Sequence, residues 1–136
     1  MDEEFLENML VVPDADLNRI TSLIIGAAIE VHRILGPGFL EVVYQKALEI
    51  ALKLSGISFV PQHRVALNYK GEPVGEGFLD FLVEGKVIVE LKSVEALGAI
   101  HTAQVISYLR ATHHKLGLLI NFNIAVLKDG IKRVAL

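Results

Sequence analysis

The stretch VIVELK, at residues 87–92, places a carboxylate and an ammonium group at the end of an apolar, β-branched run. Such a run is typical of a buried strand. Because side chains two positions apart in a strand share a face, Glu90 and Lys92 should point the same way, and the alternate apolar side chains should point into the core. Charges beside a core are unfavourable unless they are paired or bind a metal ion. The stretch therefore predicts a central strand that carries a polar site.

Patterns on both sides of this strand indicate an α/β fold. The order ααβββαβ, with a C-terminal strand or hairpin appended, predicts a mixed β-sheet flanked by helices on both faces. Asp16 is the expected N-cap of the first helix, which Gly36-Pro37-Gly38 should end. The expected helices are Leu17–Leu35, about Leu40–Leu54, and Ala99–Thr112; the expected strands are Ile57–Pro61 and Arg64–Tyr69 (one irregular strand or two), Gly77–Val83, Val87–Ser93, Leu116–Asn121, and a hairpin of Ile124–Leu127 with Ile131–Ala135.

Length and composition indicate one folded domain. The chain has 136 residues, of which 52% are hydrophobic and 21% charged, so it can bury a core. It contains no cysteine, which excludes disulfides, thiolate chemistry and cysteine zinc sites and fits a reducing cytosol. No stretch reaches the roughly 18 apolar residues of a membrane helix, and the N-terminus is acidic. We therefore expect a cytoplasmic protein with no membrane partner.

Charge is spread unevenly along the chain. Residues 1–16 hold six acids and no lysine or arginine, and we expect them to form an acidic lead-in to a single domain at residues 17–136. The whole chain has 16 acids and 13 bases, so the domain keeps ten acids against thirteen bases and is mildly basic. That balance permits a nucleic-acid partner without requiring one.

The hairpin before the VIVELK strand decides whether Asp80, in the preceding strand, can share a site with Glu90. A two-residue loop at Glu84-Gly85 would put the two carboxylates on opposite faces. A three-residue loop at residues 83–85 would place Asp80 opposite Ile88, with Glu90 as its diagonal neighbour about 7–8 Å away on the same face. The glycine of that loop suits a left-handed position. We therefore expect this loop or another of odd length.

Polar residues at helical spacing extend the candidate site. Glu41 begins the second helix, and Tyr44 lies three residues on, while Gln104 and Tyr108 are spaced i, i+4 in the later helix. Each has an ordinary alternative: an acid that complements the helix dipole, a core aromatic residue, or a solvated helix stripe. For the strand acids, the alternative is a cross-strand salt bridge to Lys92.

The sequence around Glu41 resembles a known family. Gly38–Tyr44, GFLEVVY, matches the G-x-x-E-x-x-Y signature of a group of small proteins, and Ile24–His32 and Gly117–Phe122 are also similar to it. The resemblance covers nearly the whole chain after the acidic lead-in. That group is assigned to the PD-(D/E)xK nuclease superfamily, so the resemblance implies a restriction-endonuclease-like fold.

The resemblance also implies roles for the candidate residues. The implied positions are Asp80 for the motif acid, Glu90 and Lys92 for the E-x-K, Glu41 for the leading helical acid, and Gln104 and Tyr108 for the Q-x-x-x-Y motif of RecB-like nucleases. Leu79 stands where the superfamily motif has a proline, which many members of the superfamily also lack.

The implied chemistry is metal-assisted. Glu41, Asp80 and Glu90 would be the metal ligands, and their hard oxygens suit Mg²⁺ or Mn²⁺. The metal would hold a scissile phosphate and activate a water molecule. Lys92 would orient that water or stabilise the developing negative charge, and the glutamine and tyrosine of the later helix would position phosphate or water.

The leading expectation is thus a metal-dependent nuclease acting on DNA or RNA. One alternative is a non-catalytic nucleic-acid or protein-interaction module on the same fold, which an eroded E-x-K would have favoured. Another is a structural, oligomer-forming domain, which the high apolar content favours. The same apolar content makes a homodimer the expected assembly.

Overall fold

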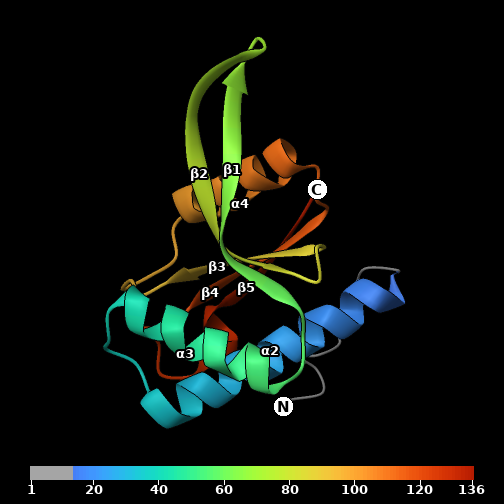
Figure 1. Ribbon diagram of the computed structural model, residues 1–136. Coiled ribbons are helices and arrows are strands. Elements are labelled where there is room, and N and C mark those ends of the chain that lie inside the picture. The colour runs from blue at the N-terminus through green and yellow to red at the C-terminus, as the bar shows by residue number, and fades with distance from the viewer. Residues whose placement is uncertain (1–13) are drawn as a thin grey trace.

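The computed structural model describes residues 14–136, and their strands form one five-stranded sheet in the order β1-β2-β3-β4-β5 (Figure 1). β3 and β4 pair in parallel, and the other neighbouring strands pair antiparallel. The predicted mixed sheet and element order are confirmed. The elements are α2 (Ala15–Leu35), α3 (Glu41–Leu54), β1 (Phe59–Tyr69), β2 (Glu72–Val83), β3 (Val87–Lys92), α4 (Ala99–Thr112), β4 (Leu116–Asn121), the 3₁₀ helix η1 (Leu127–Gly130) and β5 (Ile131–Ala135).

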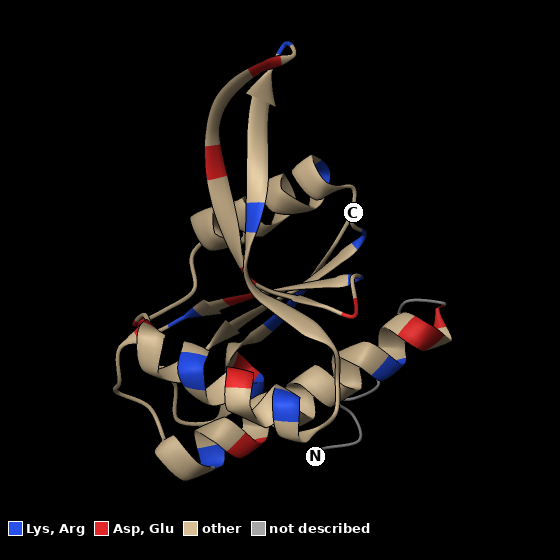
Figure 2. Cartoon of the chain, viewed as in Figure 1, with Lys and Arg blue, Asp and Glu red and all other residues tan. Residues whose placement is uncertain are grey.

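The β1–β2 hairpin continues beyond the rest of the sheet as a long arm, which rises past α4 in Figure 1. One side of the arm packs on α4 through buried residues such as Val65 and Leu79. Gly77 allows this approach, because a Cβ at that position would come within 2.7 Å of the Tyr108 ring. The bases of the arm lie on β1 and at its tip, whereas its acids lie on β2 (Figure 2).

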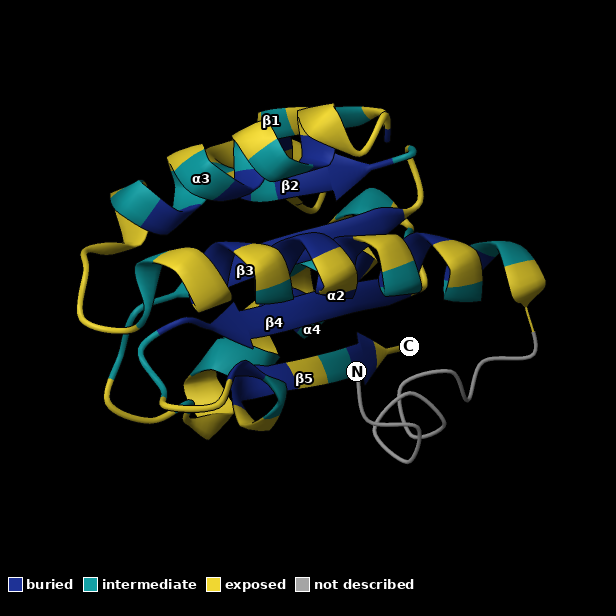
Figure 3. Cartoon of the chain, turned by 90° about the horizontal axis from the view of Figure 1, so that it is seen from below, coloured by how far each residue is buried: buried dark blue, intermediate teal, exposed yellow. Residues whose placement is uncertain are grey.

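Helices cover both faces of the sheet. On one face, α2 and α3 share a core with Val89 and Leu91 of β3, and on the other face α4 shares a core with Ile88. The alternation predicted for this strand is therefore confirmed. Figure 3 shows β4 buried between these layers, and every residue of that strand is buried. Within residues 14–136, no helix is both long enough and apolar enough to cross a membrane.

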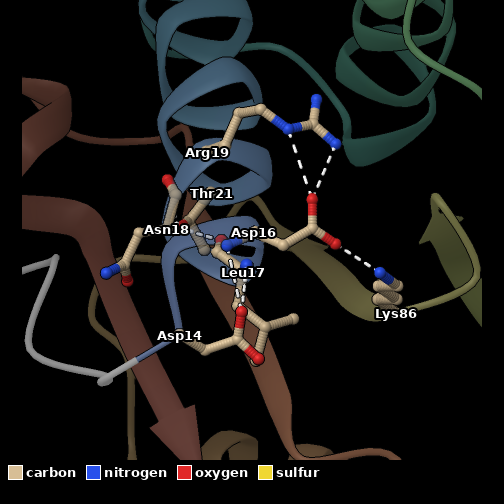
Figure 4. Close-up of polar contacts among 7 residues, drawn as sticks. All are labelled: Asp14, Asp16, Leu17, Asn18, Arg19, Thr21 and Lys86. Carbon is tan, nitrogen blue, oxygen red and sulfur yellow. Dashed lines mark hydrogen bonds and ion pairs between the residues drawn. The ribbon is translucent and has the colours of Figure 1, made fainter.

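The first helix begins earlier than expected. Asp14, and not Asp16, is its N-cap: Asp14 Oδ1 accepts hydrogen bonds from two backbone N–H groups of the first turn, at 3.0 and 3.1 Å (Figure 4). Asp16 instead forms ion pairs with Arg19, at 3.0 Å, and with Lys86. These contacts join the start of α2 to the turn between β2 and β3. The rest of the predicted acidic lead-in, residues 1–13, lies outside the described residues.

The predicted C-terminal hairpin is wrong. Residues 124–126 form no strand, and β5 pairs antiparallel with β4, as between Leu118 and Arg133. Because β4 is buried, the hydrogen-bonding groups on its free edge need a partner strand, and β5 supplies it. The arm also starts earlier than expected, since β2 begins at Glu72 rather than Gly77.

Candidate active site

The turn between β2 and β3 brings Asp80 and Glu90 together. The loop has three residues, 84–86, as the expected odd length requires, and its first two residues have positive φ angles of 53° and 66°. It begins one residue later than expected, so Ile88 pairs with Leu82 rather than with Asp80. Continuing this register by one residue places Asp80 directly opposite Glu90, and not diagonal to it as expected. Because any odd loop preserves the alternation, both carboxylates still lie on one side.

β2 and β3 separate at these carboxylates, and side chains replace the hydrogen bonds of the ladder. Regular pairing ends at Phe81. Beyond it, Asp80 N–H donates to Glu90 Oε1 over 3.1 Å, and Leu91 N–H donates to Asp80 Oδ2 over 2.7 Å. Gln45 Nε2 donates to the backbone oxygen of Asp80 over 3.1 Å. We call this place, formed by Asp80, Glu90 and Leu91, the fork.

The fork holds two carboxylates in a desolvated place. Glu90 is only 3% exposed, and burial, followed by the charge of Asp80, raises the pKa of Glu90 to about 8. Burial also raises the pKa of Asp80, although the N–H of Leu91 partly offsets this by favouring the charged form. Two carboxyl groups that interact this closely titrate as a pair, and the charge of each opposes the ionisation of the other.

Two further charges act on the fork. Glu41 begins α3, and its pKa is raised by partial burial of its carboxyl group and then by the charge of Asp80. Lys92 ends β3, and its positive charge partly offsets the rise in pKa of all three acids. Among the ion pairs within 4.0 Å that residues 14–136 form, none joins Lys92 to a carboxylate. The cross-strand salt bridge to Lys92, which was the alternative explanation for the strand acids, is therefore not formed.

Tyr44 holds the loop that precedes Glu41. The tyrosine is fully buried; its hydroxyl donates to the Gly36 oxygen over 2.6 Å and accepts from Phe39 N–H over 3.2 Å. Its ring stacks on Phe122, with centroids 4.6 Å apart and planes 9° apart. Tyr44 is thus a core aromatic residue whose hydroxyl binds backbone groups, and it sets where α3 and Glu41 begin.

The loop after Lys92 is held by Asn121, a buried polar residue at the end of β4. Asn121 Oδ1 accepts from Val94 N–H over 3.1 Å, and its Nδ2 donates to the Val94 oxygen over 2.9 Å. Ser93 Oγ donates to the Phe39 oxygen over 2.6 Å. The loops that follow β3 and precede α3 are therefore connected beside the fork.

Gln104 and Tyr108 lie on α4, beside the arm. The Tyr108 ring lies against Gly77, which precedes Asp80 by three residues, or about 10 Å along the strand. Gln104 is exposed, and no hydrogen bond within residues 14–136 joins it to the fork. The structure thus brings the three acids and Lys92 together around the fork. It places Gln104 and Tyr108 on α4, beside the arm.

Two glutamines contact Asp80 and were not predicted. Gln45 binds its backbone oxygen, and Gln62 Nε2 donates to Asp80 Oδ1 over 3.4 Å from a position with a positive φ of 47°. Gln45 lies four residues after Glu41 and so shares its helix face, a signal that could have revealed it. Gln62 carries no such signal, because its approach depends on how β1 pairs with β2.

The donor set fits a hard divalent cation that keeps part of its water shell. Within residues 14–136, no three His, Asp or Glu side chains are grouped closely enough to form a metal cluster on their own. Asp80 and Glu90 form a pair, with Glu41 near enough for the acids to affect one another's pKa. Mg²⁺ is commonly bound by one or two carboxylates together with water and substrate phosphate, so a carboxylate pair meets its needs.

Comparison with known proteins identifies the family. No curated protein matches the chain. Among solved structures, the crystal structure of SSO0001 is similar, with a TM-score of 0.45 and 17% identity over 96% of this chain and 72% of that one, which is too distant to support an argument. Residues 18–134 match the PD-(D/E)XK nuclease superfamily, and this match includes the fork, Glu41 and Lys92. The chain therefore belongs to the PD-(D/E)XK nuclease superfamily.

Proposed function

We propose that this protein is a metal-dependent nuclease that hydrolyses phosphodiester bonds in DNA or RNA. Its superfamily suggests nuclease-type function, a nucleic-acid substrate and a divalent metal. The observation that carries the proposal is the fork, where burial and the charge of Asp80 raise the pKa of Glu90 to about 8. Paired carboxylates in such a place oppose their own ionisation, and perturbed acids of this kind are concentrated at functional sites. A bound cation would relieve the repulsion.

Asp80 and Glu90 would hold this cation, with Glu41 as the third carboxylate. Their oxygens are hard donors that suit Mg²⁺ or Mn²⁺. Each fork carboxylate already accepts one backbone N–H, which fixes its orientation. When bound, the cation would supply positive charge to the phosphate and an activated water nucleophile.

The remaining candidate residues would act on the substrate. The Lys92 ammonium makes no close ion pair with the acids, so it is available to orient water or to stabilise the negative charge that develops on the phosphate. Gln104 and Tyr108 lie beside the arm and would contact the phosphate backbone farther from the scissile bond. We expect their removal to weaken positioning more than chemistry.

The G-x-x-E-x-x-Y signature supports a finer assignment, and we include it in the proposal. Gly38 has a φ of 104°, in the turn that leads into α3, and Glu41 is the leading carboxylate. Tyr44 holds the turn through its hydroxyl. The spacing thus links a fixed loop to a carboxylate near the fork. A cytoplasmic location also remains part of the proposal, on the strength of the cysteine-free composition.

A metal-titrated cleavage assay tests this function. Labelled single-stranded and double-stranded DNA and RNA would be incubated with Mg²⁺ or Mn²⁺, and cation binding would be measured by calorimetry. Asp80→Asn and Glu90→Gln keep the oxygens that accept the backbone N–H groups, so both variants should fold but lose cation binding and turnover. Glu72→Gln, an exposed acid at the start of β2 on the arm, is the matched control and should behave as wild type.

Two results would overturn the proposal. The first is a wild-type protein that binds neither cation at millimolar concentration, even with nucleic acid present. The second is cleavage by Asp80→Asn at the wild-type rate. Either result would leave a non-catalytic interaction module on the same fold as the better interpretation.

A further inference from the structure

The loop before α3 presents apolar side chains to solvent beside the fork. Phe39 is 46% exposed, Leu40 76% and Val42 53%, and these residues stand on both sides of Glu41 in the sequence. Single exposed apolar residues are ordinary, whereas a group of them indicates a contact surface. We call this group the Phe39 patch. It adjoins a candidate metal ligand and has no role in the proposed hydrolysis itself.

The backbone of Phe39 is held from two directions. Its N–H donates to the Tyr44 hydroxyl over 3.2 Å, and its oxygen accepts from Ser93 Oγ over 2.6 Å. Ser93 directly follows Lys92, and Figure 1 shows the start of α3 beside the end of β3. Phe39 therefore lies two residues from Glu41 and one hydrogen bond from the residue that follows Lys92. These contacts fix the Phe39 backbone at the border of the fork.

The ring of Phe39 keeps area for a further partner. Within residues 14–136, Tyr44 is the aromatic ring that Phe39 contacts, and the contact is T-shaped, with centroids 6.2 Å apart and planes at 66°. A T-shaped contact engages the edge of one ring, and nearly half of the Phe39 surface stays exposed. The loop thus offers an aromatic surface to solvent from a fixed backbone.

A second exposed ring lies on the arm side of the fork. Phe78 is 45% exposed and precedes Asp80 by two residues, or about 7 Å along β2. Three aromatic residues are among the large hydrophobic residues exposed within residues 14–136, and they are Phe39, Phe78 and Tyr69. The first two each precede an acid of the site by two residues, whereas Tyr69 ends β1. Exposed rings are therefore concentrated beside the candidate acids.

A nucleic acid with one phosphate at the fork must continue past the residues that border it. Exposed aromatic side chains bind single strands by stacking on bases, whose faces a duplex keeps inside. Duplexes are held mainly through their phosphates by lysine and arginine. The arginine of β1, Arg64, pairs in register with Phe78, but Glu76 already forms an ion pair with it. The border of the fork thus suits exposed bases better than duplex phosphates.

We infer that Phe39 stacks on an unpaired nucleobase next to the scissile phosphate, so that the protein prefers single-stranded nucleic acid. The inference rests on the proposed nuclease function and adds the substrate class to it. Because every base has a π-face, such a contact tolerates any sequence. A base stacked on Phe39 would hold the adjoining phosphate beside Glu41 and Lys92.

Cleavage kinetics on short labelled strands, alone and annealed to their complements, test the inference. The wild type should cleave the single strand at least about tenfold more efficiently than the duplex. Phe39→Leu keeps an apolar side chain against Tyr44 and removes the aromatic face. Its KM for the single strand should rise about tenfold with kcat unchanged, because stacking holds the substrate and its transition state equally. Phe39→Tyr should restore the wild-type KM, and the matched control Tyr69→Leu, an exposed aromatic residue near the tip of the arm, should keep it.

An abasic nucleotide supplies a second test that misfolding cannot explain. A strand that lacks one base beside the cleaved bond, on either side in turn, has lost the partner of the ring at one of the two positions. At that position the wild type should show a KM raised about tenfold, and Phe39→Leu should show no further rise, because one contact can be lost only once. Circular dichroism should show the same fold in all variants.

Several results would overturn the inference while leaving the nuclease function in place. These are equal cleavage of duplex and single strand by the wild type, an unchanged KM in Phe39→Leu, and a further tenfold rise for Phe39→Leu on the abasic strand. A Phe39→Leu variant that keeps its KM but loses self-association in light scattering would assign the patch to a second copy. A wild-type protein that cleaves no nucleic acid would overturn the proposed function and this inference together.

Discussion

Replacing Glu90 by glutamine tests whether its buried carboxyl group is protonated near neutral pH. Burial and the charge of Asp80 raise the pKa of Glu90 from 4.5 to about 8. Glutamine keeps the Oε1 that accepts the Asp80 N–H and removes the titration. Between these two pH values the folded chain holds a proton that the unfolded chain has released. The free energy of unfolding should therefore fall as the pH rises.

The two pKa values give the size of this fall. The stabilisation by the proton is complete below about pH 4.5 and is lost as the pH rises through about 8. Between pH 6 and pH 9 the wild type should lose about 3 kcal/mol of unfolding free energy, because each tenfold change in proton affinity is worth about 1.4 kcal/mol. The raised pKa values of Asp80 and Glu41 act in the same direction. Glu90→Gln should lose most of this dependence, and the control Glu72→Gln should keep it.

Urea denaturation at constant ionic strength, in the presence of a chelator, measures the effect at pH 6, 7, 8 and 9. Adding Mg²⁺ or Mn²⁺ at pH 9 should restore stability to the wild type and not to Glu90→Gln, because the cation binds only the ionised pair. A wild-type unfolding free energy that stays flat from pH 6 to pH 9 would refute the reasoning. So would a Glu90→Gln variant whose stability falls as steeply as that of the wild type.

Three further substitutions test other parts of the site. Lys92→Ala should bind Mg²⁺ as tightly as wild type or more tightly, because a like charge is gone, yet cleave about 100-fold more slowly; weaker cation binding by calorimetry would contradict this role. Tyr44→Phe should lower the free energy of unfolding in urea by about 1–2 kcal/mol, since the loop before α3 loses two hydrogen bonds, whereas the exposed Tyr69→Phe should change nothing. Gly77→Ala should cost about 1–3 kcal/mol in the same assay, because its Cβ would press on the Tyr108 ring; unchanged stability would show that α4 can move away from the arm.

Strand alternation explains why the centre of the site could be predicted from sequence. Glu90 and Asp80 share a side for any odd loop length, so an error of one residue in the position of the loop did no harm. The side chains that contact Asp80 could not be predicted from strand alternation. Gln45 and Gln62 reach it only once α3 and β1 have been placed, and that placement depends on packing between distant segments.

The errors in the fold have the same origin. Residues 124–127 look like a strand by composition, but the open edge of β4 pairs with β5 and leaves them outside the sheet. Asp14 and Asp16 are equally good capping residues by type. The choice between them depends on Lys86 of the β2–β3 turn, which is distant in sequence and forms an ion pair with Asp16.

The fork has a consequence for how such a domain can change over evolutionary time. Its carboxylates accept N–H groups that neighbouring strands would otherwise satisfy, so a side chain without an oxygen at Asp80 or Glu90 would leave a backbone amide unpaired. A substitution at either position can therefore remove the negative charge and still keep the oxygen that accepts the backbone N–H. A lineage in which the charges are no longer needed can change to asparagine and glutamine and keep the fold, whereas a change to alanine or valine would leave a backbone N–H between β2 and β3 without its acceptor. Amides at both positions would accordingly mark a descendant that keeps the fold of the fork and has lost its carboxylate charges.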